Sequence, residues 1–137
     1  MPSTQVSMAQ AVCHGLRVLI VDDNVDAADS LADLLNDLGY DCRVCYDGSA
    51  ALVVAGEHSP EVVLLDIGLP EIDGYEVARR LRATRSESAT LVALTGYGQA
   101  SDRKRVKEAG FAHHLVKPVK IETFLQLLEG IRGSAPQ

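Results

Sequence analysis

Short, mostly apolar segments alternate along this chain with longer segments in which apolar residues recur every three or four positions. The short segments are typical of β-strands, and the almost purely apolar ones of strands buried on both faces of a sheet. We expect strands at residues 16–21, 41–46, 62–65, 90–94 and 112–116.

The longer segments carry the spacing and end signals of amphipathic helices. Asn24 can cap the first helix and Gly39 can end it, while Asp73 and Glu76 can act as a capping pair further along. We expect helices at residues 25–38, 49–57, 73–81, 100–109 and 121–131. Five strand–helix units predict an α/β fold with one parallel sheet, right-handed crossovers and helices on both faces.

The length of 137 residues fits one domain. We expect a flexible leader or linker at residues 1–15, a folded domain at 16–132 and a tail at 133–137. No apolar run approaches the length of about 20 residues that spans a bilayer, and residues 1–10 lack the basic and apolar parts of a signal peptide. These features predict a cytoplasmic protein that does not enter membranes. The net charge of −6 argues against a nucleic-acid surface.

Two of the three cysteines, Cys42 and Cys45, form a C-x-x-C pattern. They fall within a predicted strand, where residues three positions apart point to opposite faces. A redox or zinc pair requires both sulfurs on one side, so we interpret these cysteines as small buried hydrophobic residues.

Polar residues that can carry chemistry follow four of the predicted strands. They are Asp22 and Asp23, Asp66, Thr95 and Lys117. The carboxyl ends of parallel strands meet at one edge of a sheet, and ligands of such sheets bind there. Three clustered carboxylates repel each other unless a divalent cation or an ammonium group lies among them. A carboxylate beside a metal, a hydroxyl and a lysine is equipped to accept a phosphoryl group.

With these residues in place, the chain resembles the receiver domain of two-component response regulators over residues 16–132. The resemblance rests on Val21-Asp22-Asp23-Asn24, Leu65-Asp66-Ile67-Gly68-Leu69-Pro70, Asp73-Gly74-Tyr75-Glu76, Leu94-Thr95-Gly96 and Lys117-Pro118. It implies a flavodoxin-like doubly wound fold with strand order 2-1-3-4-5, for which a receiver protein is a standard example.

The resemblance also implies the chemistry of the site. Asp66 is then the phosphoacceptor, and its donor is a phosphohistidine on a histidine kinase or a histidine phosphotransfer domain. Mg²⁺, with Mn²⁺ able to take its place, would be held by Asp23, Asp66 and the backbone carbonyl of Gly68, with Asp22 helping.

Lys117 and Thr95 would assist the transfer, and Pro118 would follow a cis peptide bond. Thr95 and His114 would form the switch, although the family commonly has Tyr or Phe where this chain has His114. The face built by residues 100–131 would then meet a protein target or a second copy of the domain.

Three other functions remain open at this point. One is a Mg²⁺-dependent phosphohydrolase with an aspartate nucleophile, but those enzymes resemble D-x-D, and here Asn24 stands two residues after Asp22. The others are a phosphorylation-independent adaptor and a disulfide-active redox protein. We expect no enzyme activity beyond the domain's own phosphotransfer and dephosphorylation. The domain could stand alone or belong to a hybrid histidine kinase.

Overall fold

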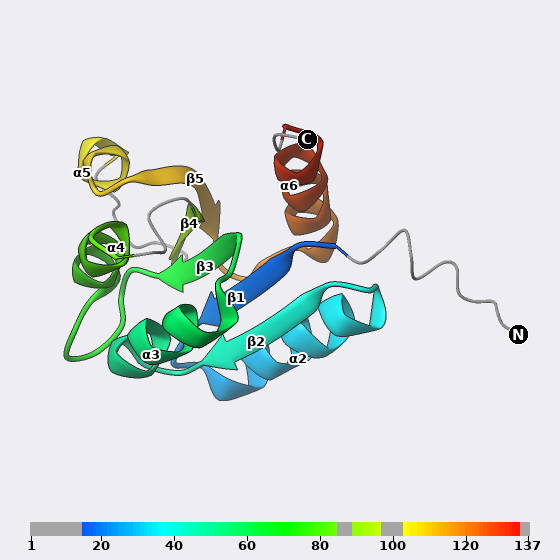
Figure 1. Ribbon diagram of the computed structural model, residues 1–137, viewed down its shortest axis with the longest axis horizontal. Helices are drawn as coiled ribbons and strands as arrows, with labels where there is room; N and C mark the ends of the chain where they lie inside the picture. Colours follow the sequence, from blue (N-terminus) through cyan, green and yellow to red (C-terminus); the bar gives the residue numbers. More distant parts are fainter. Residues whose placement is uncertain (1–14, 85–88, 97–102, 135–137) are drawn as a thin grey trace, which may run out of the picture.

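The computed structural model describes residues 15–84, 89–96 and 103–134, and in these ranges strands and helices alternate as predicted (Figure 1). The strands are β1 (Arg17–Val21), β2 (Asp41–Cys45), β3 (Val62–Asp66), β4 (Thr90–Thr95) and β5 (Phe111–Val116). The helices are α2 (Val25–Asp37), α3 (Gly48–His58), α4 (Gly74–Arg82), α5 (Arg103–Glu108) and α6 (Ile121–Ser134).

The five strands form one parallel sheet in the order β2-β1-β3-β4-β5, which confirms the predicted fold. Their carboxyl ends are nearly level. Val21 pairs with both Cys45 and Leu65, and Thr95 pairs with Val116. Polar residues that follow these ends therefore lie at one edge of the sheet.

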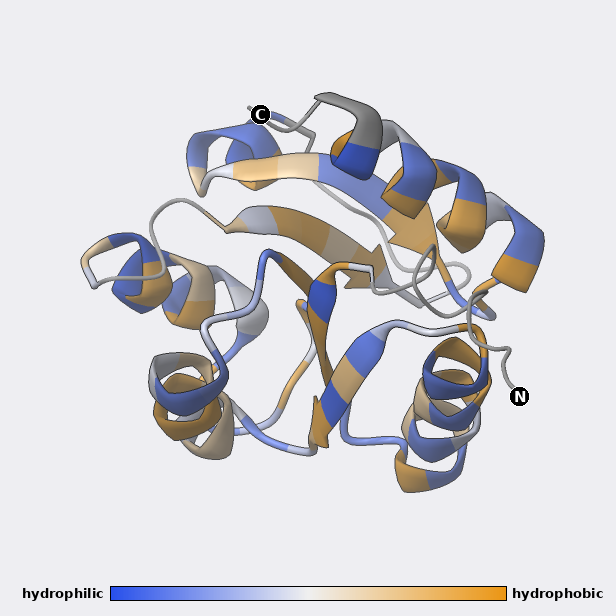
Figure 2. Cartoon of the chain, turned by 45° about the vertical axis from the view of Figure 1, so that its right-hand side comes forward, coloured by the Kyte–Doolittle hydropathy of each residue, from blue (hydrophilic) through white to orange (hydrophobic). Residues whose placement is uncertain are grey.

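Helices cover both faces of the sheet, with α2 and α6 on one side and α3, α4 and α5 on the other (Figure 1). Each face has its own apolar core. Leu35, Phe124 and Leu128 are buried in the first, and Val77 and Leu81 in the second. Coloured by hydropathy, the strands are largely apolar, and the helices carry hydrophilic stretches (Figure 2). None of the helices in the described ranges has the length and apolar character needed to cross a bilayer.

The local end signals act largely as the sequence predicted. The Asn24 side chain accepts a hydrogen bond from the Ala27 amide at the start of α2, and Gly39 has a φ of 98° just beyond its end. Strand ends agree with the predicted ends within one residue. The last helix is longer than predicted: α6 continues to Ser134, so the expected tail begins inside a helix. The predicted helix at 100–109 is described from Arg103 to Glu108, and residues 100–102 lie outside the described ranges.

Candidate functional site

Three carboxylates meet at the carboxyl edge of the sheet. Asp22 and Asp23 follow β1, and Asp66 is the last residue of β3. Each offers a carboxylate oxygen within 4.8 Å of the others. Asp22 and Asp66 are each only 4% exposed, whereas Asp23 is exposed. The parallel register thus brings together three residues that the sequence predicted to converge.

Lys117 lies between two of these carboxylates. Its Nζ is 3.0 Å from Asp22 Oδ1 and 2.7 Å from Asp66 Oδ2. Burial alone would lower the pKa of Lys117, but hydrogen bonds with Asp66 and Asp22 and their negative charges outweigh burial, and the pKa is raised. The ammonium therefore remains charged at neutral pH and partly relieves the repulsion within the cluster.

Backbone amides orient the two buried carboxylates. The Asn24 amide donates to Asp22 Oδ1 over 3.0 Å, and the Gly68 amide donates to Asp66 Oδ1 over 2.8 Å. The sequence analysis assigned Gly68 a role through its carbonyl only, and Asn24 a role as a helix cap. The sequence alone does not indicate these donors, because an amide two residues after a carboxylate reaches it only when the loop turns back.

The loop after β3 returns tightly against the site because α4 begins with glycine. A Cβ on Gly74 would lie 2.4 Å from Ile67 Cα and 2.7 Å from the Asp66 carbonyl oxygen. Asp73 caps the helix by accepting from the Glu76 amide over 3.0 Å, as predicted. The Glu76 side chain instead bonds Arg79 and Arg80, so only one half of the expected capping pair forms.

Thr95 and His114 lie on the neighbouring strand ends and contact each other. Thr95 is 1% exposed, and its Oγ1 is 2.9 Å from His114 Nε2. The Thr95 carbonyl accepts from the Lys117 amide over 2.7 Å, and the Lys117–Pro118 peptide bond is cis. The hydroxyl, the imidazole and the lysine thus belong to one connected group beside Asp66.

The donor set suits a hard divalent cation. Asp22, Asp23 and Asp66 supply only oxygen, and Mg²⁺ prefers oxygen ligands while keeping several waters. The lysine already balances part of the charge, which leaves a net negative cluster for a cation to neutralise. Chemically, the arrangement presents a buried carboxylate nucleophile with a cation and a hydroxyl close by.

The C-x-x-C residues lie away from each other. Cys42 packs in the core under α2 and α6, and Cys45 in the core on the opposite face of the sheet. Both thiols are free and buried. Burial, aided by Asp41 and Asp47 respectively, raises the pKa of Cys42 to about 12 and that of Cys45 to about 11. Neither forms the thiolate that redox chemistry needs at neutral pH.

Packing also creates a groove that the sequence analysis did not predict. It has a volume of about 650 Å³ and lies beside Lys117, lined by apolar residues of α2 and of the segment that leads into α6, among them Leu31, Leu34 and Ile121. Its walls come from segments far apart in the chain, and local periodicity carries no information about such a contact.

Comparison with known proteins agrees with this geometry. The family model of the response regulator receiver domain matches residues 18–129. The polar-differentiation response regulator DivK of Brucella ovis is 30% identical over 119 residues, which cover 86% of this chain and 97% of DivK.

Solved structures give the same picture. Chemotaxis protein CheY4 of Vibrio cholerae has a TM-score of 0.77 and 27% identity, covering 85% of this chain and 98% of that one. The receiver domain of sensor histidine kinase PA1611 from Pseudomonas aeruginosa was solved with a magnesium ion coordinated in its active site cleft. It has a TM-score of 0.77 and 30% identity, covering 88% of this chain and 99% of that one. Given a family model that matches most of its length, relatives covered almost end to end and the shared fold, this chain belongs to the response regulator receiver domain family.

Proposed function

We propose that this domain is a switch in a two-component phosphorelay and that Asp66 accepts the phosphoryl group. The observation that carries the proposal is the position of Asp66, a buried carboxylate that bonds the ammonium of Lys117 and has an oxygen within 4.8 Å of those of Asp22 and Asp23. The donor is a phosphohistidine of a histidine kinase or a histidine phosphotransfer domain, the partners with which receiver domains interact.

In the transfer, a carboxylate oxygen of Asp66 attacks the phosphorus. The bond between phosphorus and the donor imidazole nitrogen breaks, and its electron pair leaves with the imidazole. Lys117, which already bonds Asp66 Oδ2, can move its ammonium onto a phosphoryl oxygen as a point charge. The Thr95 hydroxyl donates to another phosphoryl oxygen, so residues of this chain compensate charge on two sides of the group.

Mg²⁺ is the metal we assign to the site, held by Asp22, Asp23, Asp66 and the carbonyl of Gly68. The oxygen-only donor set supports this assignment, as does the magnesium ion in the related PA1611 receiver domain. When bound, it would neutralise charge on the transferring phosphoryl group and orient that group for in-line attack. Mn²⁺ has the same preference for oxygen ligands and can replace it.

The domain then works as a signalling element. Its chemistry is limited to its own phosphorylation and dephosphorylation, and residues 16–132 suffice for it. A phosphohydrolase is less well supported, because Asn24 stands where a D-x-D pattern has its second aspartate and uses its side chain to cap α2.

Phosphorylation by acetyl phosphate tests the proposal without knowledge of the kinase. We expect intact-protein mass spectrometry to show one added phosphoryl group in Mg²⁺ and none in chelator. Asp66→Asn nearly keeps the side-chain shape but lacks the nucleophile, and its label should fall to background. Asp37→Asn makes the same chemical change at an exposed site on α2 and should leave the label at the parent level. Full labelling of Asp66→Asn would show that the phosphoacceptor lies elsewhere.

A further inference from the structure

Thr95 has its hydroxyl in a hydrogen bond with an imidazole before any phosphoryl group arrives. Thr95 Oγ1 is 2.9 Å from His114 Nε2, and it also lies 3.5 Å from the Leu115 carbonyl oxygen. The hydroxyl has one proton to donate, and its side chain is buried. Which group receives that proton therefore depends on the state of the imidazole.

Two arrangements satisfy the 2.9 Å contact. If Nε2 carries no proton, it accepts the hydroxyl proton, and Thr95 has none left for another acceptor. If Nε2 carries a proton, it donates to Oγ1, and the hydroxyl proton is available to another acceptor, such as the Leu115 carbonyl oxygen. A protonated imidazole always has a proton on Nε2, whereas a neutral imidazole has one in only one of its two tautomers.

We propose that His114 is a positioning residue that controls whether the Thr95 hydroxyl can donate to the phosphoryl group, and that it thereby makes phosphorylation depend on pH. This inference rests on the proposed function, because it assumes that Thr95 donates to the group on Asp66. Binding of a phosphoryl group requires the free hydroxyl proton, so it selects imidazole with a proton on Nε2. Acid conditions supply that form, and phosphorylation should therefore be favoured as the pH falls.

Within the described ranges, Lys107 is the charged residue that lines a surface hollow with this imidazole. His113 and His114 of β5 line a surface hollow together with Val106 and Lys107 of α5. The residues of β4 carry no charge, and Thr95 is the one whose side chain contacts His114. Just beyond β5, the ammonium of Lys117 donates to Asp22 and Asp66. The polar contact of Nε2 that the structure shows is the one with Thr95 Oγ1.

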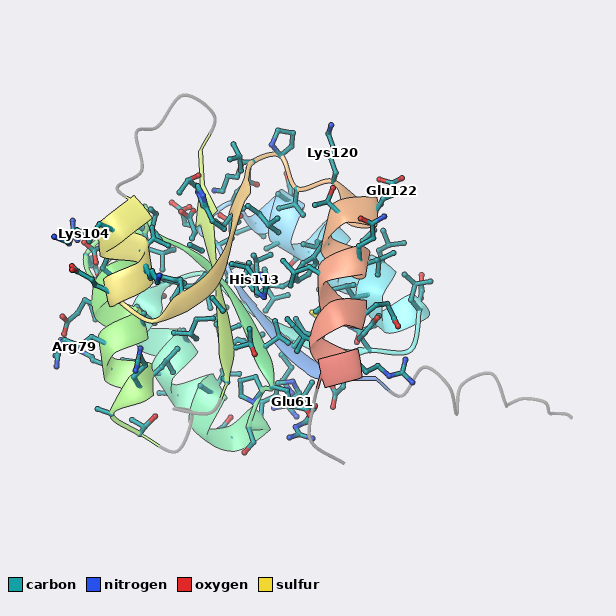
Figure 3. All side chains as sticks on the ribbon, turned by 90° about the horizontal axis from the view of Figure 1, so that it is seen from above. Glu61, Arg79, Lys104, His113, Lys120 and Glu122 are labelled. Carbon is teal, nitrogen blue, oxygen red and sulfur yellow. The ribbon has the colours of Figure 1, made fainter. Side chains whose placement is uncertain are left out.

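The neighbouring histidine is an internal control. His113 pairs with Val92, whose side chain packs under α2 and α6, and His114 pairs with Ala93, whose side chain packs in the opposite core. His113 also lines a hollow with Thr123 and Gln126 of α6, and Figure 3 shows it on the side of β5 toward that helix. It shares the strand and the solvent but not the contact with Thr95.

The first measurement follows the ring nitrogens of both histidines by ¹⁵N NMR during a pH titration. It is made without and with beryllofluoride in saturating Mg²⁺, where beryllofluoride mimics the phosphoryl group on Asp66. On binding we expect the His114 midpoint to move to higher pH and the His113 midpoint to move much less. In Thr95→Ala, which lacks the hydroxyl, the His114 displacement should shrink markedly. An undiminished displacement in that variant would mean that charge alone connects the two sites, and would overturn the inference.

The second measurement compares beryllofluoride affinity at pH 6 and pH 8. The ratio of affinities in the parent is divided by the ratio in His114→Gln, which cancels the pH dependence of the reagent itself. Because one hydrogen bond is exchanged, we expect the ratio of the affinity at pH 6 to the affinity at pH 8 to be about three- to tenfold larger in the parent than in His114→Gln. His113→Gln should behave like the parent, and His114→Phe gives a second non-titrating side chain should His114→Gln fold poorly.

The outcomes separate the two proposals. Equal ratios in the parent and in His114→Gln, with beryllofluoride still bound, would refute the role of His114 and leave the function of Asp66 intact. Failure of beryllofluoride to bind the folded parent in Mg²⁺ would refute the proposed function itself.

Discussion

At the scale of single residues, Lys117 has a structural role as well as a chemical one. Its side chain is 29% exposed and bonds two carboxylates that are almost fully buried. Such carboxylates cost free energy unless a positive group is near, because the surrounding protein screens charge less than water does. The same ammonium that would contact a phosphoryl oxygen therefore also stabilises the carboxylates at this edge of the sheet.

We predict that Lys117→Gln lowers the free energy of unfolding by about 1–3 kcal/mol in chelator, because Asp22 and Asp66 lose their shared cation. Mg²⁺ should recover part of this loss by relieving the same repulsion. Urea unfolding with and without Mg²⁺ measures both effects.

The matched control is Lys120→Gln, which makes the same change three residues further on. Lys120 is exposed and points away from the body of the protein (Figure 3). It should change the free energy of unfolding by no more than about 0.5 kcal/mol. Equal losses in both variants would show that the carboxylates do not depend on Lys117.

At the scale of elements, the first turn of α4 sets the backbone around Asp66, the proposed phosphoacceptor. Gly74 begins this helix against the backbone of Asp66 and Ile67. Gly56 lies inside α3, and a Cβ there would meet no atom within 4 Å. The position of Gly74 therefore has no room for a side chain, whereas the position of Gly56 can accept one.

We predict that Gly74→Ala lowers the free energy of unfolding by about 1–3 kcal/mol, since a backbone contact must give way. It should also reduce acetyl phosphate labelling, because the displaced backbone carries Asp66. Gly56→Ala should raise the free energy of unfolding by about 0.5–1 kcal/mol, because alanine favours the helix. Denaturant unfolding and labelling of the two variants check this, and a stable, fully labelled Gly74→Ala would contradict the close approach.

At the scale of the whole molecule, charge is unevenly divided along the chain. The first 73 residues contain thirteen acidic and only two basic side chains, counting Lys, Arg, Asp and Glu. Asp22, Asp23 and Asp66 belong to this acidic half. The negative charges of this half produce an electrostatic potential that attracts cations toward the edge of the sheet, and added salt screens that potential. The affinity for Mg²⁺ should therefore fall with ionic strength.

We predict that Mg²⁺ raises the melting temperature through binding to the folded state. The stabilisation is about 1.4 kcal/mol at a concentration ten times Kd, which corresponds to several degrees for a domain of this size. Asp23→Ala should remove most of this response and keep the metal-free melting temperature, because the side chain is exposed and one repelling charge is lost. Asp33→Ala, also exposed but on α2, should keep the full response. An unchanged response in Asp23→Ala would place the metal elsewhere.

The local pattern of the sequence determined the fold class and the residues that converge at the edge of the sheet. The spacing of apolar residues along each strand and helix indicates which side of the segment is buried. Parallel strands place their carboxyl ends at the same edge of the sheet. Asp22, Asp23, Asp66, Thr95 and Lys117 could be grouped on that basis alone. The strand order came from the resemblance to receiver domains, because periodicity does not specify which strands are neighbours.

Only the tertiary structure decided which atoms meet. Three contacts join groups whose positions depend on loops and rotamers. They are the salt bridges from Lys117 to Asp22 and Asp66, the hydrogen bond from the Gly68 amide to the Asp66 carboxylate, and the contact between Thr95 and His114. The apolar groove beside α2 and the separation of Cys42 from Cys45 into two cores depend equally on packing. A side chain's own segment determines whether it is buried, but its partner comes from another segment, and only the folded chain brings the two together.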